Sequence, residues 1–223
     1  NTGEILAIFC NILLGGPVIF LPVQILWMNL ITDGVTAIAL GVEPGEKSAM
    51  RRPPRNPRQA LLDWRGMLMV AAFGSYIGLV TLWLFQSYLH SSDPRDIAVA
   101  GTVAFTAIVV MEKINVLNFR SLREPMAKIG FFSNPWILVA VAAMISLQVA
   151  AVYVPVLQHA LHTTPLTAGD WGKILASAAP IFLMGELAKR WSAFRQSTGA
   201  ADRVHVSAES PSGEEATQWG STR

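Results

Sequence analysis

The sequence predicts an all-α membrane protein, a bundle of about five full transmembrane helices with a partial one at the N-terminus. Its composition is the first reason. Of 223 residues, 52% are hydrophobic and only 14% are charged, and the mean hydropathy is +0.42. Soluble domains carry about 25% charged residues. The chain therefore has too little polar surface for water, and the long apolar runs described next are the second reason.

A helix needs roughly 20 mostly apolar residues to cross a bilayer. We predict full spans at about 22–42, 66–89, 97–118, 135–157 and 171–188. The first apolar stretch, within residues 1–14, ends at Gly15-Gly16-Pro17. At about 1.5 Å rise per residue it covers only about half of a bilayer. We therefore expect it to be the end of a helix that starts earlier, in a longer protein of which this chain is a fragment.

The distribution of Lys and Arg predicts the orientation of these spans. Loops 43–65 and 119–133 and the residues after 188 are rich in them, whereas the alternate loops together hold only Arg95. Lys and Arg accumulate on the cytoplasmic side, so we expect the basic loops to be cytoplasmic. We thus predict a multi-pass integral membrane protein in contact with the lipid bilayer. The character of its loops favours the bacterial plasma membrane as its location.

The Pro-rich loop, the C-terminal tail, the net charge and the cysteine count add four further expectations. The Pro-rich "RRPPRNP" cannot form a continuous helix and predicts an exposed loop. The polar tail 196–223 is typical of disorder. A net charge of +2 gives no reason to expect a nucleic-acid partner, and a single cysteine, Cys10, excludes an internal disulfide.

A few polar side chains lie deep inside the predicted spans. Ionisable groups there cost at least about 2.5–3.5 kcal/mol on insertion scales and are functional candidates by default. In "WMNLITDG", Asn29, Thr32 and Asp33 follow the i, i+3, i+4 spacing and share one helix face. Asn1 and Glu4 repeat the i, i+3 spacing on the first helix, and Glu112 lies on a third.

Oxygen ligands of this kind suit hard cations, and Ca²⁺ takes six to eight oxygens. The candidate metal ligands would supply about nine oxygens, which is ample for one Ca²⁺; they are Asn1, Glu4, Asn29, Thr32, Asp33 and Glu112. We expect Gly34 to let its helix unwind locally and turn carbonyl groups toward the ion. No residue is predicted to be catalytic.

The alternative is that polar side chains simply hold helices together, which is common in membranes. That interpretation suits Asn11, Asn115 or Thr36, but an ionised carboxylate is a costly way to join helices. Glu112 has a further alternative, because the adjacent Lys113 could neutralise it. We expect Lys113 instead to extend its ammonium toward the cytoplasmic end.

Three patterns in this set resemble those of a known family. "NTGEILAIF" followed by "LPVQILWMNLITDGVTAIALGVEPGEKSAMRRPPR" resembles the fifth and sixth transmembrane helices of P-type ATPases, and within them calcium pumps of the sarco/endoplasmic reticulum type and their bacterial relatives. The family's N-x-x-E pair is matched by Asn1 and Glu4. Its N-x-x-T-D pattern is matched by Asn29, Thr32 and Asp33, and its eighth-helix Glu before N-x-L-N by Glu112 before "NVLN".

The resemblance implies the C-terminal half of a pump's transport domain, helices five to ten, with Ca²⁺ as the transported ion. The sequence contains no D-K-T-G-T phosphorylation motif. Mg²⁺ and ATP would therefore act through domains that this chain lacks, and enzyme activity would belong to the parent P-type ATPase. Loop 43–65 would contact those cytoplasmic domains, and the missing N-terminal helices would be further partners. Alternatives are a pump for Na⁺, Mn²⁺ or H⁺, and a channel or scaffold without ATPase chemistry.

Two further spacings, one of glycines and one of histidines, do not point to a functional site. Gly74 and Gly78 form a G-x-x-x-G pattern, which allows close helix contact, and we expect them to pack against the first helix. His159 and His162 have no evident third partner and do not predict a metal site.

Overall fold

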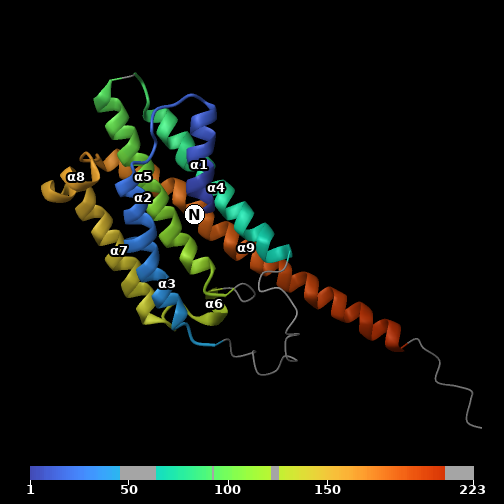
Figure 1. The fold of residues 1–223 in the computed structure, drawn as a ribbon. Coiled ribbons are helices and arrows are strands. Elements are labelled where there is room, and N and C mark those ends of the chain that lie inside the picture. Colours follow the sequence, from blue (N-terminus) through green and yellow to red (C-terminus); the bar gives the residue numbers. More distant parts are fainter. Residues whose placement is uncertain (46–63, 92, 122–125, 209–223) are drawn as a thin grey trace, which may run out of the picture.

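The structure, a computed structural model, describes residues 1–45, 64–91, 93–121 and 126–208, without the side chains of residues 65, 127 and 190–208. Every secondary-structure element in these ranges is a helix (Figure 1). They are α1 (Thr2–Leu13), α2 (Pro22–Leu26), the π-helix η1 (Trp27–Thr32), α3 (Asp33–Gly41), α4 (Trp64–Tyr88), α5 (Pro94–Asn118), α6 (Met126–Ile129), α7 (Pro135–Tyr153), α8 (Pro155–Leu161) and α9 (Ala168–Ala208).

Four helical segments in the described residues are long and apolar enough to cross a membrane: Pro22–Gly41, Gly66–Tyr88, Pro94–Asn118 and Pro135–Tyr153. The first of them runs continuously through α2, η1 and α3, and α1 is a shorter apolar helix. These segments confirm the predicted all-α membrane bundle. The further span expected at 171–188 lies within α9 and is not one of the four, so it stays a prediction.

Two boundaries differ from the sequence-based expectation. α7 ends at Tyr153 rather than near residue 157, because Val154 is extended and Pro155 starts a separate helix. α9 continues to Ala208, into the tail that we predicted to be disordered from residue 196. No proline interrupts it after Pro180, and extending an existing helix costs far less than nucleating one. The "RRPPRNP" loop and residues 209–223 lie outside the described residues.

Local sequence signals explain where the long helices begin. Proline is in the first turn of both α5 and α7, where its missing N–H costs nothing. The Asp93 side chain caps α5 by accepting a hydrogen bond from the Arg95 N–H at 2.8 Å. Asn134 caps α7 in the same way, accepting from the N–H groups of Trp136 and Ile137. These caps fix the start of the two helices.

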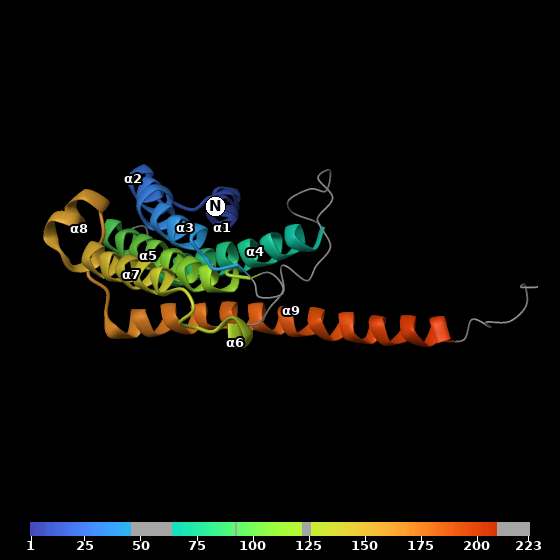
Figure 2. The same cartoon turned by 90° about the horizontal axis from the view of Figure 1, so that it is seen from below.

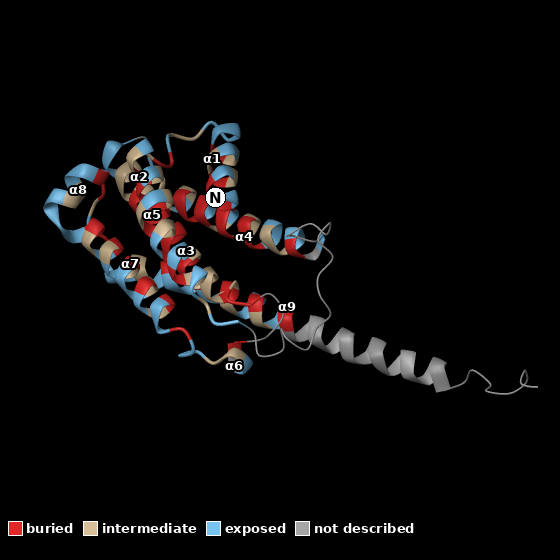
Figure 3. Ribbon diagram, turned by 60° about the horizontal axis from the view of Figure 1, so that its bottom comes forward, coloured by how far each residue is buried: buried red, intermediate tan, exposed pale blue. Residues whose placement is uncertain are grey.

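Helix α5 is the centre of the bundle. α4, α7 and α9 contact it, and Figure 2 shows α1–α3 on one side of the layer of α4, α5 and α7 and α9 on the other. An unbroken stretch of α5 from Thr102 to Met111 is buried. Figure 3 colours the buried residues of the bundle red. A helix that is apolar all round belongs in such a core. A charged residue on α5 near this stretch is therefore held at the centre of the protein.

Glycines bring α1 against α4. A Cβ added at Gly78 would lie 2.7 Å from the carbonyl oxygen of Gly3, and one added at Gly74 would lie 2.7 Å from Cβ of Thr2. No real side chain fits at those distances, so the absence of a side chain at these two glycines is what lets α1 and α4 approach closely. The predicted packing of the G-x-x-x-G pattern against the first helix is confirmed. It also fixes the position of Glu4, the next residue on α1.

Candidate cation-binding site

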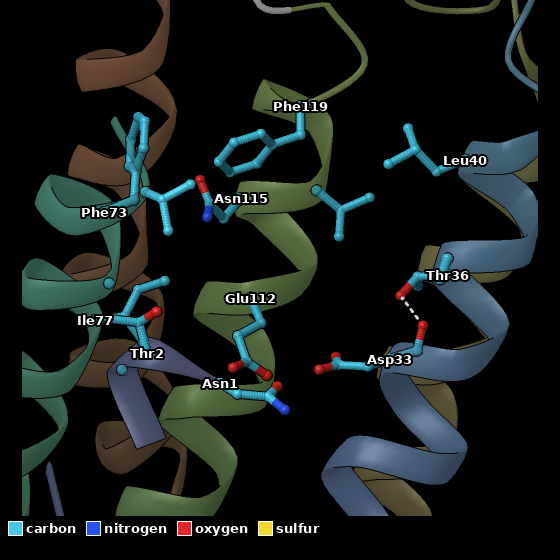
Figure 4. A pocket seen from close by; sticks show the side chains of 15 residues that line it. Asn1, Thr2, Asp33, Thr36, Leu40, Phe73, Ile77, Glu112, Asn115 and Phe119 are labelled. Atoms are coloured by element: carbon cyan, nitrogen blue, oxygen red, sulfur yellow. Dashed lines mark hydrogen bonds between the residues drawn. The ribbon is translucent and has the colours of Figure 1, made fainter. Parts of the chain in front are cut away.

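Three carboxylates from three helices meet inside the bundle. Glu4 of α1, Asp33 of α3 and Glu112 of α5 each offer an oxygen, and these oxygens lie within 4.8 Å of one another. Figure 4 shows Glu112 beside Asn1, with Asp33 pointing toward them from α3. Like charges at this separation repel strongly where the effective dielectric constant is low. Bringing three carboxylates together is thus favourable only with positive charge among them.

Two of the carboxylate oxygens have no hydrogen-bond partner among the described residues. They are Oε1 of Glu4 and Oε2 of Glu112, and both atoms are buried. Glu4 as a whole is only 3% exposed. Leaving a buried polar atom unpaired costs about 1–3 kcal/mol, and more when it is charged. A cation bound among the three carboxylates would satisfy such unpaired oxygens.

A π-helical segment leads into this site. η1 ends at Thr32, directly before Asp33, and such wide turns occur frequently at functional sites. The hydroxyl of Thr32 donates to the carbonyl of Met28 at 2.8 Å, and that of Thr36 donates to the carbonyl of Thr32 at 3.0 Å. The expected unwinding at Gly34 is therefore wrong, because the chain stays helical there and hydroxyl groups satisfy carbonyls along the wide segment.

The amide and hydroxyl candidates differ in how close they lie to the carboxylates. Asn29 donates through Nδ2 to Oε2 of Glu4 at 3.1 Å and to the carbonyl of Ile25 at 3.0 Å, which ties η1 to α1. Asn1 lines the same pocket as Asp33 and Glu112. Thr32 is fully buried, bonds back to its own helix and does not line that pocket. The structure thus brings five of the six candidates together and leaves Thr32 apart.

The pocket itself has a volume of about 330 Å³ and lies between α1, α3, α4 and α5. Its polar end holds Asn1, Asp33 and Glu112, and it continues along the helices past Asn115 to Phe119 (Figure 4). The sequence favoured Asn115 as a helix-joining residue. Its side chain instead accepts from Nδ2 of Asn118 on the same helix, at 3.2 Å, and it lines the pocket. A small hydrated cation fits this space.

Lys113 is the main departure from the sequence-based expectation. Its Nζ lies 2.5 Å from Oδ1 of Asp33, and its side chain is 0% exposed. The expected extension toward the cytoplasmic end is therefore wrong, because the central position of α5 encloses the side chain and Asp33 faces it. The alternative of a Lys113–Glu112 pair is not what forms either. The lysine neutralises a carboxylate on another helix, and Oε2 of Glu112 keeps no partner among the described residues.

A second charged cluster, here called the arginine cluster, joins the ends of α3 and α5. It consists of Arg120, Glu43, Ser133 and Asn134. Arg120 donates to the Glu43 carboxylate through Nε at 3.0 Å and Nη2 at 2.7 Å, and to Ser133 Oγ at 2.6 Å. Asn134 donates to Oε2 of Glu43 at 2.7 Å. The sequence-based prediction did not include the arginine cluster. Opposite charges just beyond the ends of two neighbouring spans are the pattern that could have indicated it.

Comparison with known proteins adds an independent finding. Residues 17–191 match the family model described as "Cation transporting ATPase, C-terminus". Over 185 residues the chain is 36% identical to the "Calcium-transporting ATPase" of Bacillus subtilis (strain 168), an alignment covering 82% of this chain and 21% of that protein.

A fungal protein gives a similar result. Over 218 residues the chain is 30% identical to the "Endoplasmic reticulum calcium ATPase srcA" of Aspergillus fumigatus, with 85% of this chain and 22% of that protein covered. The chain thus spans about a fifth of the length of either relative.

Proposed function

The chain belongs to the family of cation-transporting ATPase C-terminal regions, and we propose that it forms part of the transport site of an ATP-driven pump that moves Ca²⁺. The observation that carries the proposal is the convergence of Glu4, Asp33 and Glu112, of which Glu4 and Glu112 each have a buried oxygen without a partner in the described part of the chain. Both relatives described above have calcium in their names.

The ligand chemistry supports a hard cation. The candidate atoms are carboxylate and amide oxygens, and among the described residues no His or Cys joins the three carboxylates. Such sets suit Ca²⁺ more than softer metals, which prefer nitrogen and sulfur. Glu4 and Glu112 would each give a free oxygen, Asp33 its second oxygen, and Asn1 an amide oxygen. Thr32 would contribute only after a rearrangement of η1.

The arrangement also suggests how ion affinity could change during a cycle. The three carboxylates lie on α1, α3 and α5, so a small shift of one helix changes two of the three distances between their oxygens. Ca²⁺ binds its oxygens at 2.3–2.6 Å, and a separation that grows by a few tenths of an ångström weakens the site. Mg²⁺ and ATP would act through domains outside this chain, and the Bacillus relative favours a bacterial plasma membrane as its location.

Replacing Asp33 by Asn in the full-length pump tests the proposal. We expect calcium-dependent phosphorylation from ATP to be abolished, because the central carboxylate is lost while size and shape are kept. Phosphorylation and ATPase activity should be titrated across Ca²⁺, Mn²⁺, Na⁺ and K⁺, which separates the candidate ions. Asp96→Asn is the matched control: this aspartate lies at the other end of α5 and bonds Ser91. Normal phosphoenzyme in Asp33→Asn would contradict the assignment.

A further inference from the structure

We propose that Lys113 is a tethered cation that fills one coordination position of Asp33 and limits this site to a single divalent ion. The inference rests on the proposed function, because it concerns how many ions the carboxylates hold. It goes beyond that function by assigning a role to a residue that is not itself an ion ligand.

The first step is the contact between Lys113 and Asp33. Nζ lies 2.5 Å from Oδ1, and the lysine is fully enclosed while the Asp33 side chain is 33% exposed. An enclosed ammonium has lost its water, and among the described residues Asp33 is the carboxylate that it contacts at hydrogen-bond distance. It is therefore held at a fixed point, next to the pocket that Asp33 and Glu112 line.

The second step is the division of the oxygens. Oδ1 of Asp33 is taken by Lys113, and Oε2 of Glu4 accepts from Asn29. Among the described residues, the buried carboxylate oxygens of this site that are left without partners are Oε1 of Glu4 and Oε2 of Glu112. An ion held by the three carboxylates, which each bring an oxygen within 4.8 Å of the others, would take these unpaired oxygens first. A second ion on Oδ1 of Asp33 would have to share that atom with an ammonium.

The third step is the charge. Within this chain, three carboxylates and one ammonium leave two negative charges, the amount that one divalent cation neutralises. A second divalent ion would lie within a few ångströms of both the first ion and Lys113, where repulsion in a low-dielectric site is strong. Geometry and charge thus point to the same limit.

A purely structural role of Lys113 would give a different experimental result. A lysine that only held α5 to α3 would change the stability of the pump when removed. It would leave the number of bound ions unchanged. A tethered cation determines that number, so the ratio of bound ions to phosphorylation sites is the informative measurement.

The experiment uses the purified full-length pump and radioactive Ca²⁺. We expect the wild type to bind one Ca²⁺ per phosphorylation site, with a Hill coefficient near one. In Lys113→Met the ratio should rise above one, and half-saturation should need roughly tenfold less Ca²⁺ because a repelling charge is gone. Lys113→Arg keeps the charge and should keep the ratio. Lys128→Met, which removes an exposed lysine of α6, is the matched control and should behave as the wild type.

Two results would overturn the proposal. One is a ratio of two in the wild type, a measurement that does not depend on any variant folding. The other is an unchanged ratio in Lys113→Met. A wild-type pump without calcium-dependent phosphorylation would overturn the proposed function, and this inference with it. A calcium-activated pump with two bound ions would overturn this inference alone.

Discussion

The carboxylate site and the arginine cluster are two groups of charges that both involve α3 and α5, and they differ in how completely their atoms are paired. Arg120 satisfies Glu43 through three hydrogen bonds, and Asn134 adds another. At the carboxylate site, Glu4 and Glu112 each keep a buried oxygen without a partner in the described residues. A cluster that is fully bonded by protein atoms holds helices together. One that is left incomplete leaves room for an ion.

Arg120→Met tests the structural side of this comparison and has the largest expected effect on stability. Removing the guanidinium leaves Glu43 partly buried without its counter-charge, which costs about 3–5 kcal/mol for a buried pair. We expect a lower denaturation temperature of the full-length pump in detergent. The calcium concentration for half-maximal phosphorylation should stay near that of the wild type.

The double variant Arg120→Met, Glu43→Leu is the control for that experiment. Removing both charges should recover part of the lost stability, since no uncompensated carboxylate remains. Wild-type stability in Arg120→Met, or a large loss of calcium affinity without loss of stability, would contradict the division between the two clusters.

Gly78→Ala asks whether helix packing sets the geometry of the carboxylate site. The added methyl group would lie 2.7 Å from the carbonyl oxygen of Gly3, one residue before Glu4. Overpacking of this kind costs about 1–3 kcal/mol, and α1 must move away from α4. We expect both thermal stability and calcium affinity to fall. Gly172→Ala, at a position with open space around it, should change neither; affinity that is unaffected in Gly78→Ala would separate packing from the site.

Glu112→Gln has the smallest expected effect, and we expect it to change calcium affinity without lowering stability. The substitution removes one negative charge and keeps an oxygen, so we expect calcium affinity to fall about tenfold, equivalent to about 1.4 kcal/mol. Calcium titration of phosphorylation measures it. Stability without calcium should not fall, because repulsion among the carboxylates is relieved. An unchanged titration would remove Glu112 from the ligands.

Part of this arrangement could be predicted from the sequence, because it depends on local spacing. Long apolar runs predict the spans, and the helical spacing of Asn29 and Asp33 predicts a shared polar face. The glycine spacing of α4 predicts a close contact with α1. The i, i+3, i+4 rule says which side chains share a face, but it does not say which neighbour that face meets. The partner of Lys113 was therefore beyond prediction.

The sequence by itself determined that this chain is a helical membrane protein with carboxylates inside its spans, where apolar side chains would have a lower free energy. Composition and periodicity are local properties, so they can be read along the chain. Only the tertiary structure decided that Lys113 pairs with Asp33 rather than extending to the membrane surface, that Thr32 turns back to its own helix, and that Arg120 joins α3 to α5. Each of these depends on atoms more than 70 residues apart or on the winding of η1, neither of which a local sequence pattern specifies.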